Sequence, residues 1–90
     1  MAQLQSQLDG LIRQTALAQS RSALAGKALQ RQQQLVAEGF VSAASLEDKQ
    51  AELMQADGQV AALQAAQAEV ARLLASARAE AQQLPLAADN

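Results

Sequence analysis

Two long stretches of the chain repeat their apolar residues every three or four positions, and one short interruption separates them. Residues from about 3 to 38 and from about 43 to 84 consist mainly of Ala, Leu, Gln, Arg and Lys, which favour helical backbone. The interruption is the segment Gly39-Phe40-Val41-Ser42. The pattern therefore predicts a helix over about 3–38, a turn at 39–42 and a second helix over about 43–84.

A seven-residue repeat runs along both predicted helices and indicates that they pack against each other as a coiled coil. In the first helix the repeating positions are Leu4, Leu8, Leu11, Thr15, Ala18, Ser22, Ala25, Leu29, Gln32 and Val36. In the second helix they are Leu46, Lys49, Leu53, Ala56, Val60, Leu63, Gln67, Val70, Leu74, Ala77, Ala81 and Leu84. Folding the chain back at the turn pairs these two sets in one constant register. The expected fold class is all-α, a long antiparallel two-helix coiled-coil hairpin, with residues 1–90 forming a single domain.

Two layers of this predicted seam are polar. Thr15 is expected to meet Gln67, and Gln32 is expected to meet Lys49. Polar residues in such a seam cost stability but fix the register of the two helices. Outside the seam, a thinner apolar stripe on the first helix either widens the buried face or forms a lateral surface for another helix. This stripe consists of Leu17, Leu24, Ala28 and Leu35.

The predicted turn carries helix-ending and helix-starting signals on its two sides. Gly39 suits the left-handed position that follows the end of a helix, and Phe40 after it is placed to touch Leu35. Ser42 is a favourable N-cap for the second helix, because its hydroxyl can accept from a free backbone N–H. At the other end, Pro85 is expected to stop the second helix, since proline disfavours helical geometry in the residue before it.

The composition restricts the chemistry that the chain can perform. Half of its 90 residues are hydrophobic, one is aromatic, and none is His or Cys. Acids and bases are interleaved at a net charge of −2, so no basic stripe for nucleic acid is expected. No apolar run is long enough to span a membrane. Because a two-helix hairpin offers no pocket for tuned catalytic groups, we expect no enzyme activity, no metal site and no cofactor.

The one pattern that resembles a binding site is Arg31-x3-Leu35-x6-Ser42, which spans the predicted turn. Each residue also has an ordinary structural interpretation. Arg31 can be a surface arginine, Leu35 can complete the helix-end contact with Phe40, and Ser42 can be only an N-cap. The position of all three at the turn of a coiled-coil hairpin favours a shared role in binding.

With this motif, and with its Ala-, Gln- and Leu-rich heptads, the whole chain resembles the α-helical hairpin of periplasmic adaptors. These are the HlyD-type membrane fusion proteins of bacterial type I secretion and tripartite efflux. The resemblance rests on Arg31, Leu35 and Ser42 at the hairpin tip and on the turn 39–42. In that family the three tip residues contact the periplasmic end of a TolC-like outer-membrane channel. The resemblance implies the same partner-binding role for Arg31, Leu35 and Ser42 here.

The resemblance also implies partners and a location. The hairpin is expected to be excised from a larger adaptor, since the family's lipoyl-like halves, β-barrel and membrane anchor are not in this sequence. The parent protein would lie in the periplasm of a Gram-negative bacterium, anchored to the inner membrane. It would bind an inner-membrane transporter through its other parts and would assemble with neighbouring copies. Type I secretion of a peptide or protein is favoured over drug efflux. The alternative is a structural, dimerising coiled-coil spacer without a channel partner.

Overall fold

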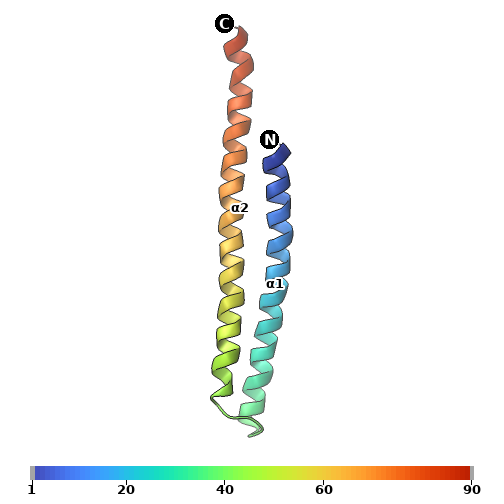
Figure 1. Ribbon diagram of the computed structural model, residues 1–90, viewed down its shortest axis with the longest axis vertical. Helices are drawn as coiled ribbons and strands as arrows, with labels where there is room; N and C mark the ends of the chain where they lie inside the picture. The colour runs from blue at the N-terminus through green and yellow to red at the C-terminus, as the bar shows by residue number, and fades with distance from the viewer. Residues whose placement is uncertain (1, 90) are drawn as a thin grey trace.

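Two long helices make up the fold. The computed structural model describes the backbone of residues 2–89 and the side chains of residues 2–83. Helix α1 spans Ala2–Ala37 and α2 spans Ser45–Asp89. The two helices run side by side in opposite directions, so both termini lie at the same end of the molecule (Figure 1). The predicted all-α antiparallel hairpin is confirmed.

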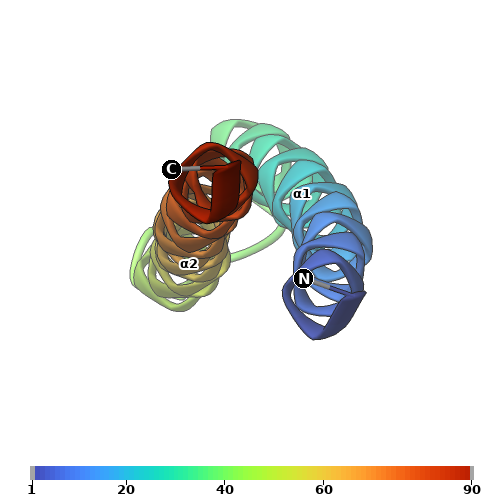
Figure 2. The same ribbon diagram turned by 90° about the horizontal axis from the view of Figure 1, so that it is seen from above.

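The hairpin is narrow and elongated, with extents of 78 × 15 × 13 Å. Seen along its long axis, the helices tilt in opposite directions across each other (Figure 2). Such a tilt lets a seam of side chains stay between two helices over many turns, as the seven-residue repeat requires.

The residues between the helices are those of the predicted seam. Ala18, Leu74 and Thr15 are buried. The other predicted seam positions are half-buried, in α1 over 4–36 and in α2 over 46–77. Ala81 is exposed, because a register that pairs Leu8 with Leu74 runs out of α1 before it reaches this residue. The predicted seam position at Leu84 lies outside the described side chains.

Side chains that share the surface grooves between the helices support the predicted register. Leu11 of α1 and Val70 of α2 line one groove, and Ala18 and Leu63 line another. One of the two predicted polar layers also forms, because the Gln67 amide donates to the Thr15 hydroxyl. The heptad pattern therefore predicted the fold and the pairing of the layers from Leu11 to Ala18 with those from Leu63 to Val70.

The two ends of α2 differ from the sequence-based prediction. The helix begins at Ser45 instead of near Ala43, because the first turn after Ser42 is closed by i→i+3 hydrogen bonds. The predicted stop before Pro85 is wrong, since α2 continues to Asp89. Proline removes one hydrogen bond from the helical ladder. The leucines and alanines on both sides of Pro85 favour helical backbone, so the helix continues past the proline.

Candidate functional site at the turn

Helix α1 ends in a reversal whose first residues, Gly39 and Phe40, are hydrogen-bonded to its last turn. Gly39 has a φ of 82°, in the left-handed region that glycine adopts without strain. Its N–H donates to the Val36 carbonyl at 3.0 Å, and the Phe40 N–H donates to the Leu35 carbonyl at 2.9 Å. These two bonds define a Schellman ending, as the position of Gly39 predicted. The Phe40 side chain remains 73% exposed, so any contact with Leu35 covers little of the ring.

The start of α2 is held by a serine that no sequence motif pointed to. The Ser45 N–H and hydroxyl both donate to the Ser42 carbonyl, at 3.2 and 2.6 Å. The Gln32 amide of α1 donates to the same Ser45 hydroxyl at 2.7 Å. Gln32 was expected opposite Lys49, but its amide bonds one helical turn closer to the loop. The chain of bonds Gln32–Ser45–Ser42 therefore ties the end of α1 to the first turn of α2.

Ser42 occupies the capping position through its backbone. Its carbonyl accepts the first bond of α2, as the N-cap carbonyl does. Among the hydrogen bonds found within the described residues, its hydroxyl takes no part. The predicted hydroxyl cap is thus replaced by the Ser45 network, and the exposed Ser42 hydroxyl faces solvent.

The three residues of the motif lie at the same end of the molecule but differ in setting. Arg31 is exposed and Leu35 is half-buried. They are four residues apart in α1, so they lie on one face, one turn apart. Ser42 lies beyond the end of α1, in the loop that leads to α2. Within the described part of the chain, no hydrogen bond joins Ser42 to the other two.

The apolar stripe of α1 divides into two parts. Ala28 and Leu35 are half-buried and widen the seam. Leu17 and Leu24 are 55% and 65% exposed. Arg31 follows Leu24 by one heptad, so it continues this exposed row toward the turn. The first alternative therefore describes Ala28 and Leu35, while a lateral surface for another helix at Leu17 and Leu24 stays a prediction.

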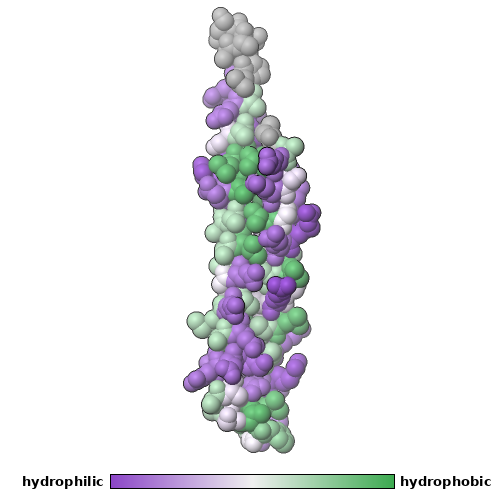
Figure 3. All heavy atoms as spheres, viewed as in Figure 1, coloured by the Kyte–Doolittle hydropathy of each residue, from purple (hydrophilic) through white to green (hydrophobic). Residues whose placement is uncertain are grey.

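Two shallow grooves run between the helices on the side of this stripe. The first is lined by Gln7, Gly10, Leu11, Gln14 and Val70. The second is lined by Gln14, Leu17, Ala18, Arg21, Gln59 and Leu63. The space-filling view shows apolar and polar side chains interspersed along a whole face of the hairpin (Figure 3). Arg21 is the charged side chain among the residues that line these two grooves.

Charge is divided unequally between the helices. Helix α1 carries four basic residues and one acid, whereas α2 carries three basic residues and seven acids. The ion pairs within the described residues are local to α2, Lys49 with Glu52 at 3.5 Å and Arg72 with Glu69 at 2.7 Å. The hydrogen bond from Arg72, and then its charge, hold the pKa of Glu69 below its usual range. The basic side chains of α1 thus pair with no acid of α2 among these contacts.

The described residues contain no group of three or more His, Cys, Asp or Glu side chains placed to bind a metal ion. Neither helix, over its described length, has an apolar stretch sufficient to cross a membrane. No family model matches the chain, and no curated protein or solved structure is significantly similar to it.

Proposed function

We propose that this hairpin is the docking element of a periplasmic adaptor, and that its turn binds the periplasmic end of a TolC-like outer-membrane channel. The observation that carries the proposal is the position of the motif. Arg31 and Leu35 lie on one face at the end of α1, and Ser42 follows within the hydrogen-bonded reversal. A spacer needs only a glycine and a cap at its turn, and it gives no reason for this spacing of Arg31 and Leu35.

The chemistry of the three side chains suits a helical partner. Leu35 is half-buried, so it can cover more of its surface by entering an apolar groove between two partner helices. The exposed Arg31 guanidinium can donate several parallel hydrogen bonds to carbonyl or carboxylate oxygens at the rim of such a groove. The free Ser42 hydroxyl can donate or accept beside them.

Several copies acting together fit the small size of the hairpin end. One tip offers little area, so a ring of copies would strengthen the contact through multivalency. Placing the basic α1 of one copy beside the acidic α2 of the next would bring opposite charges together. The same arrangement would cover the exposed Leu17 and Leu24. These features support neighbouring copies as partners.

The wider setting follows from the adaptor role. The parent protein would be anchored to the inner membrane of a Gram-negative bacterium, with the hairpin in the periplasm. An inner-membrane transporter would bind other parts of the parent protein. Type I secretion of a peptide or protein is proposed ahead of drug efflux, and the hairpin itself has no catalytic role in this scheme.

A binding measurement tests the proposal. The 90-residue chain is attached at high density to a sensor surface through its C-terminus, which leaves the turn free, and a purified TolC-type channel is passed over it. Arg31→Asp and Leu35→Ser should each weaken binding at least tenfold, since each removes a contact at the turn. Ser42→Asp should also weaken it, although aspartate remains a good cap.

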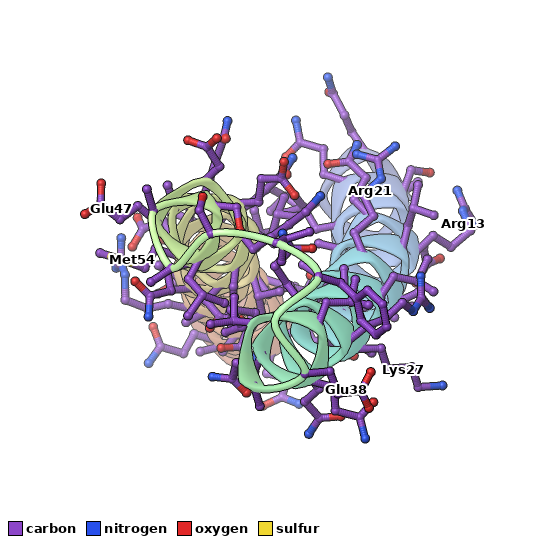
Figure 4. All side chains as sticks on the ribbon, turned by 90° about the horizontal axis from the view of Figure 1, so that it is seen from below. Arg13, Arg21, Lys27, Glu38, Glu47 and Met54 are labelled. Atoms are coloured by element: carbon purple, nitrogen blue, oxygen red, sulfur yellow. The ribbon has the colours of Figure 1, made fainter. Side chains whose placement is uncertain are left out.

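The matched control is Arg13→Asp, which reverses an exposed arginine of α1 on the side away from α2, more than four helical turns from Arg31 (Figure 4). It should bind like the unaltered chain. Helix content by circular dichroism should be the same for all variants, because no altered residue is buried. Unchanged binding by folded Arg31→Asp and Leu35→Ser variants would refute the docking proposal.

The second candidate function is a dimerising coiled-coil spacer, and the exposed Leu17 and Leu24 are the observation in its favour. A spacer would associate through this row of α1 with no role for the turn. Sedimentation distinguishes the two functions. In a spacer, Leu17→Gln with Leu24→Gln would abolish association, and the channel would bind neither this variant nor the unaltered chain.

A further inference from the structure

We infer that Phe40 and Glu38, which flank Gly39, form a second binding element at the turn, with an apolar anchor beside a carboxylate. Neither residue belongs to the Arg31–Leu35–Ser42 pattern. The inference rests on the proposed docking of the turn and specifies the partner's chemistry, an apolar groove edged by a basic side chain.

Phe40 is presented to solvent on a fixed backbone. It is the only aromatic residue of the chain, and 73% of its surface is exposed. Its N–H is bound to the Leu35 carbonyl at 2.9 Å, directly after the left-handed Gly39. Because the backbone at Phe40 is fixed before binding, only the two side-chain torsions remain to be ordered when a partner buries the ring. Aromatic residues of this kind supply much of the affinity of small interfaces.

Glu38 occupies a position that is unfavourable for the hairpin itself. It directly follows the last residue of α1, where the helix dipole repels negative charge. The last turn of α1 contains no basic residue, and neither ion pair of the described residues includes Glu38. Viewed from the turn, Glu38 points outward from the end of α1, away from α2 (Figure 4). Glu38 therefore does not stabilise the end of α1, and its outward position suits contact with a partner.

The acids of α2 provide the contrast. Glu47 and Asp48 lie in the first turn of α2, where the positive end of the helix dipole favours them. Figure 4 shows Glu47 pointing outward on the opposite side of the hairpin from Glu38. These two acids have a local explanation, whereas Glu38 has none.

The charge and size of the hairpin end indicate which kind of partner can bind it. Residues 36–48 contain three carboxylates and no base, so two tips meeting end to end would repel each other. The cross-section of 15 × 13 Å is a small fraction of the roughly 800 Å² per partner that a stable interface buries. The partner must therefore enclose Phe40 and supply positive charge near Glu38. We assign this role to the channel end, with an arginine or lysine at the rim of its groove.

The same sensor-surface measurement with the purified channel tests Phe40. Phe40→Ala should weaken binding at least tenfold, and Phe40→Leu should retain part of it, because leucine fills part of the same groove. Met54→Ala is the matched control. Met54 is 74% exposed, almost the same as Phe40, but it lies on the outer side of α2 (Figure 4). This control should leave binding unchanged.

For Glu38 the test compares binding with thermal stability. Glu38→Gln should weaken binding several-fold and reduce its dependence on salt, while the melting temperature rises because a repelled charge is removed. Glu47→Gln should instead lower the melting temperature and leave binding to the channel unchanged. A residue with only a structural role would not separate the two measurements in this way.

The outcomes separate this inference from the docking proposal. If Phe40→Ala and Glu38→Gln bind the channel normally while Arg31→Asp does not, the turn docks without the second element and the inference is wrong. Both proposals are wrong if the variants Arg31→Asp, Leu35→Ser, Phe40→Ala and Glu38→Gln all bind the channel normally. Both are also wrong if the unaltered chain does not bind the channel. Loss of binding in Arg31→Asp, Phe40→Ala and Glu38→Gln, with Met54→Ala unaffected, supports both.

Discussion

The half of the hairpin near the chain termini and the half near the turn are built differently. The open half consists of residues 2–21 of α1 with residues 61–80 of α2, and the turn half consists of residues 22–37 with 45–60. The three residues that are buried among the described side chains, Thr15, Ala18 and Leu74, belong to the open half. In the turn half, no residue of these described ranges is buried.

Hydrogen bonds across the seam occur in both halves, since the Gln32 amide donates to the Ser45 hydroxyl in the turn half and Arg78 donates to Gln5 in the open half. In the open half the Gln67 amide reaches the Thr15 hydroxyl and the Leu11 carbonyl from a half-buried position. In the turn half, the Ser22 hydroxyl donates to Asp57 at an exposed site. The turn already keeps the adjacent layers together covalently, so they need less packing than layers far from it. The contrast teaches that the hairpin can expose side chains at its turn because its packing is concentrated elsewhere.

The largest expected effect is at Leu74, which is 4% exposed. Leu74→Ala should lower the free energy of unfolding by about 2–3 kcal/mol, because it removes buried apolar surface and leaves a cavity. Leu53→Ala in the turn half should cost about 1 kcal/mol, since Leu53 is only half-buried. Urea unfolding followed by circular dichroism measures both. Equal losses would show that the two halves are packed alike.

The polar layer should give the next largest effect. The Thr15 hydroxyl donates to the Leu11 carbonyl at 2.7 Å and accepts from Gln67. Thr15→Val should cost about 1–2 kcal/mol of unfolding free energy, because the half-buried Gln67 amide loses its best acceptor.

Adding Gln67→Leu should restore much of that loss, since the apolar pair leaves no amide without an acceptor. Urea unfolding of the two single variants and the double variant gives the coupling energy. Additive losses would mean that the two side chains act independently and do not form one layer.

Glycines provide a test of backbone geometry with opposite signs. A methyl group added at Gly26 or Gly58 meets no atom within 4 Å, so Gly26→Ala and Gly58→Ala should each raise the free energy of unfolding by about 1 kcal/mol. Gly39→Ala should lower it by about 1–2 kcal/mol because of its positive φ. The measurement is again urea unfolding. A gain from Gly39→Ala would contradict the Schellman ending.

The smallest effect concerns the exposed pair of Glu69 and Arg72 in the open half. The pKa of Glu69 is lowered in the folded state by the hydrogen bond and then the charge of Arg72. Its contribution is therefore present above the usual carboxyl pKa and is lost as the pH falls through the lowered value. Glu69→Gln should leave the melting temperature at pH 7 almost unchanged, because the pair is exposed to solvent.

Melting curves measured from pH 7 down to pH 3 should show a slightly shallower acid decline in the Glu69→Gln variant. A large drop at pH 7 in that variant would show that this exposed pair matters more than the buried seam of the same half.

The sequence predicted the fold because the two helices pack against each other along a seven-residue repeat that can be recognised in it. The heptads of Leu, Val and Ala identified the seam, and the left-handed Gly39 identified the turn. A repeat does not decide between local alternatives of similar energy. Gln32 bonds to Ser45 because a flexible amide can reach any of several acceptors near the loop.

The candidate site was predictable only in part. The spacing of Arg31, Leu35 and Ser42 could be recognised in the sequence, but the exposure of Phe40 depends on where the reversal directs its ring. Leucine-rich neighbours also continued α2 past Pro85, where the sequence pattern predicted an end. In each case the outcome depends on geometry at the end of a helix, where few bonds decide between competing conformations.

Because both chain ends leave the hairpin at the same end (Figure 1), tension applied between them would peel the helices apart layer by layer instead of shearing the whole seam at once. Such tension would reach the layers around Leu74, Thr15 and Ala18 before it reached the turn half, and these three are the buried residues among the described side chains. The best-packed layers of the hairpin thus lie in the half where unzipping starts. Tension would reach the turn only after these buried layers had separated, and until then Gly39 and its neighbours would keep their geometry.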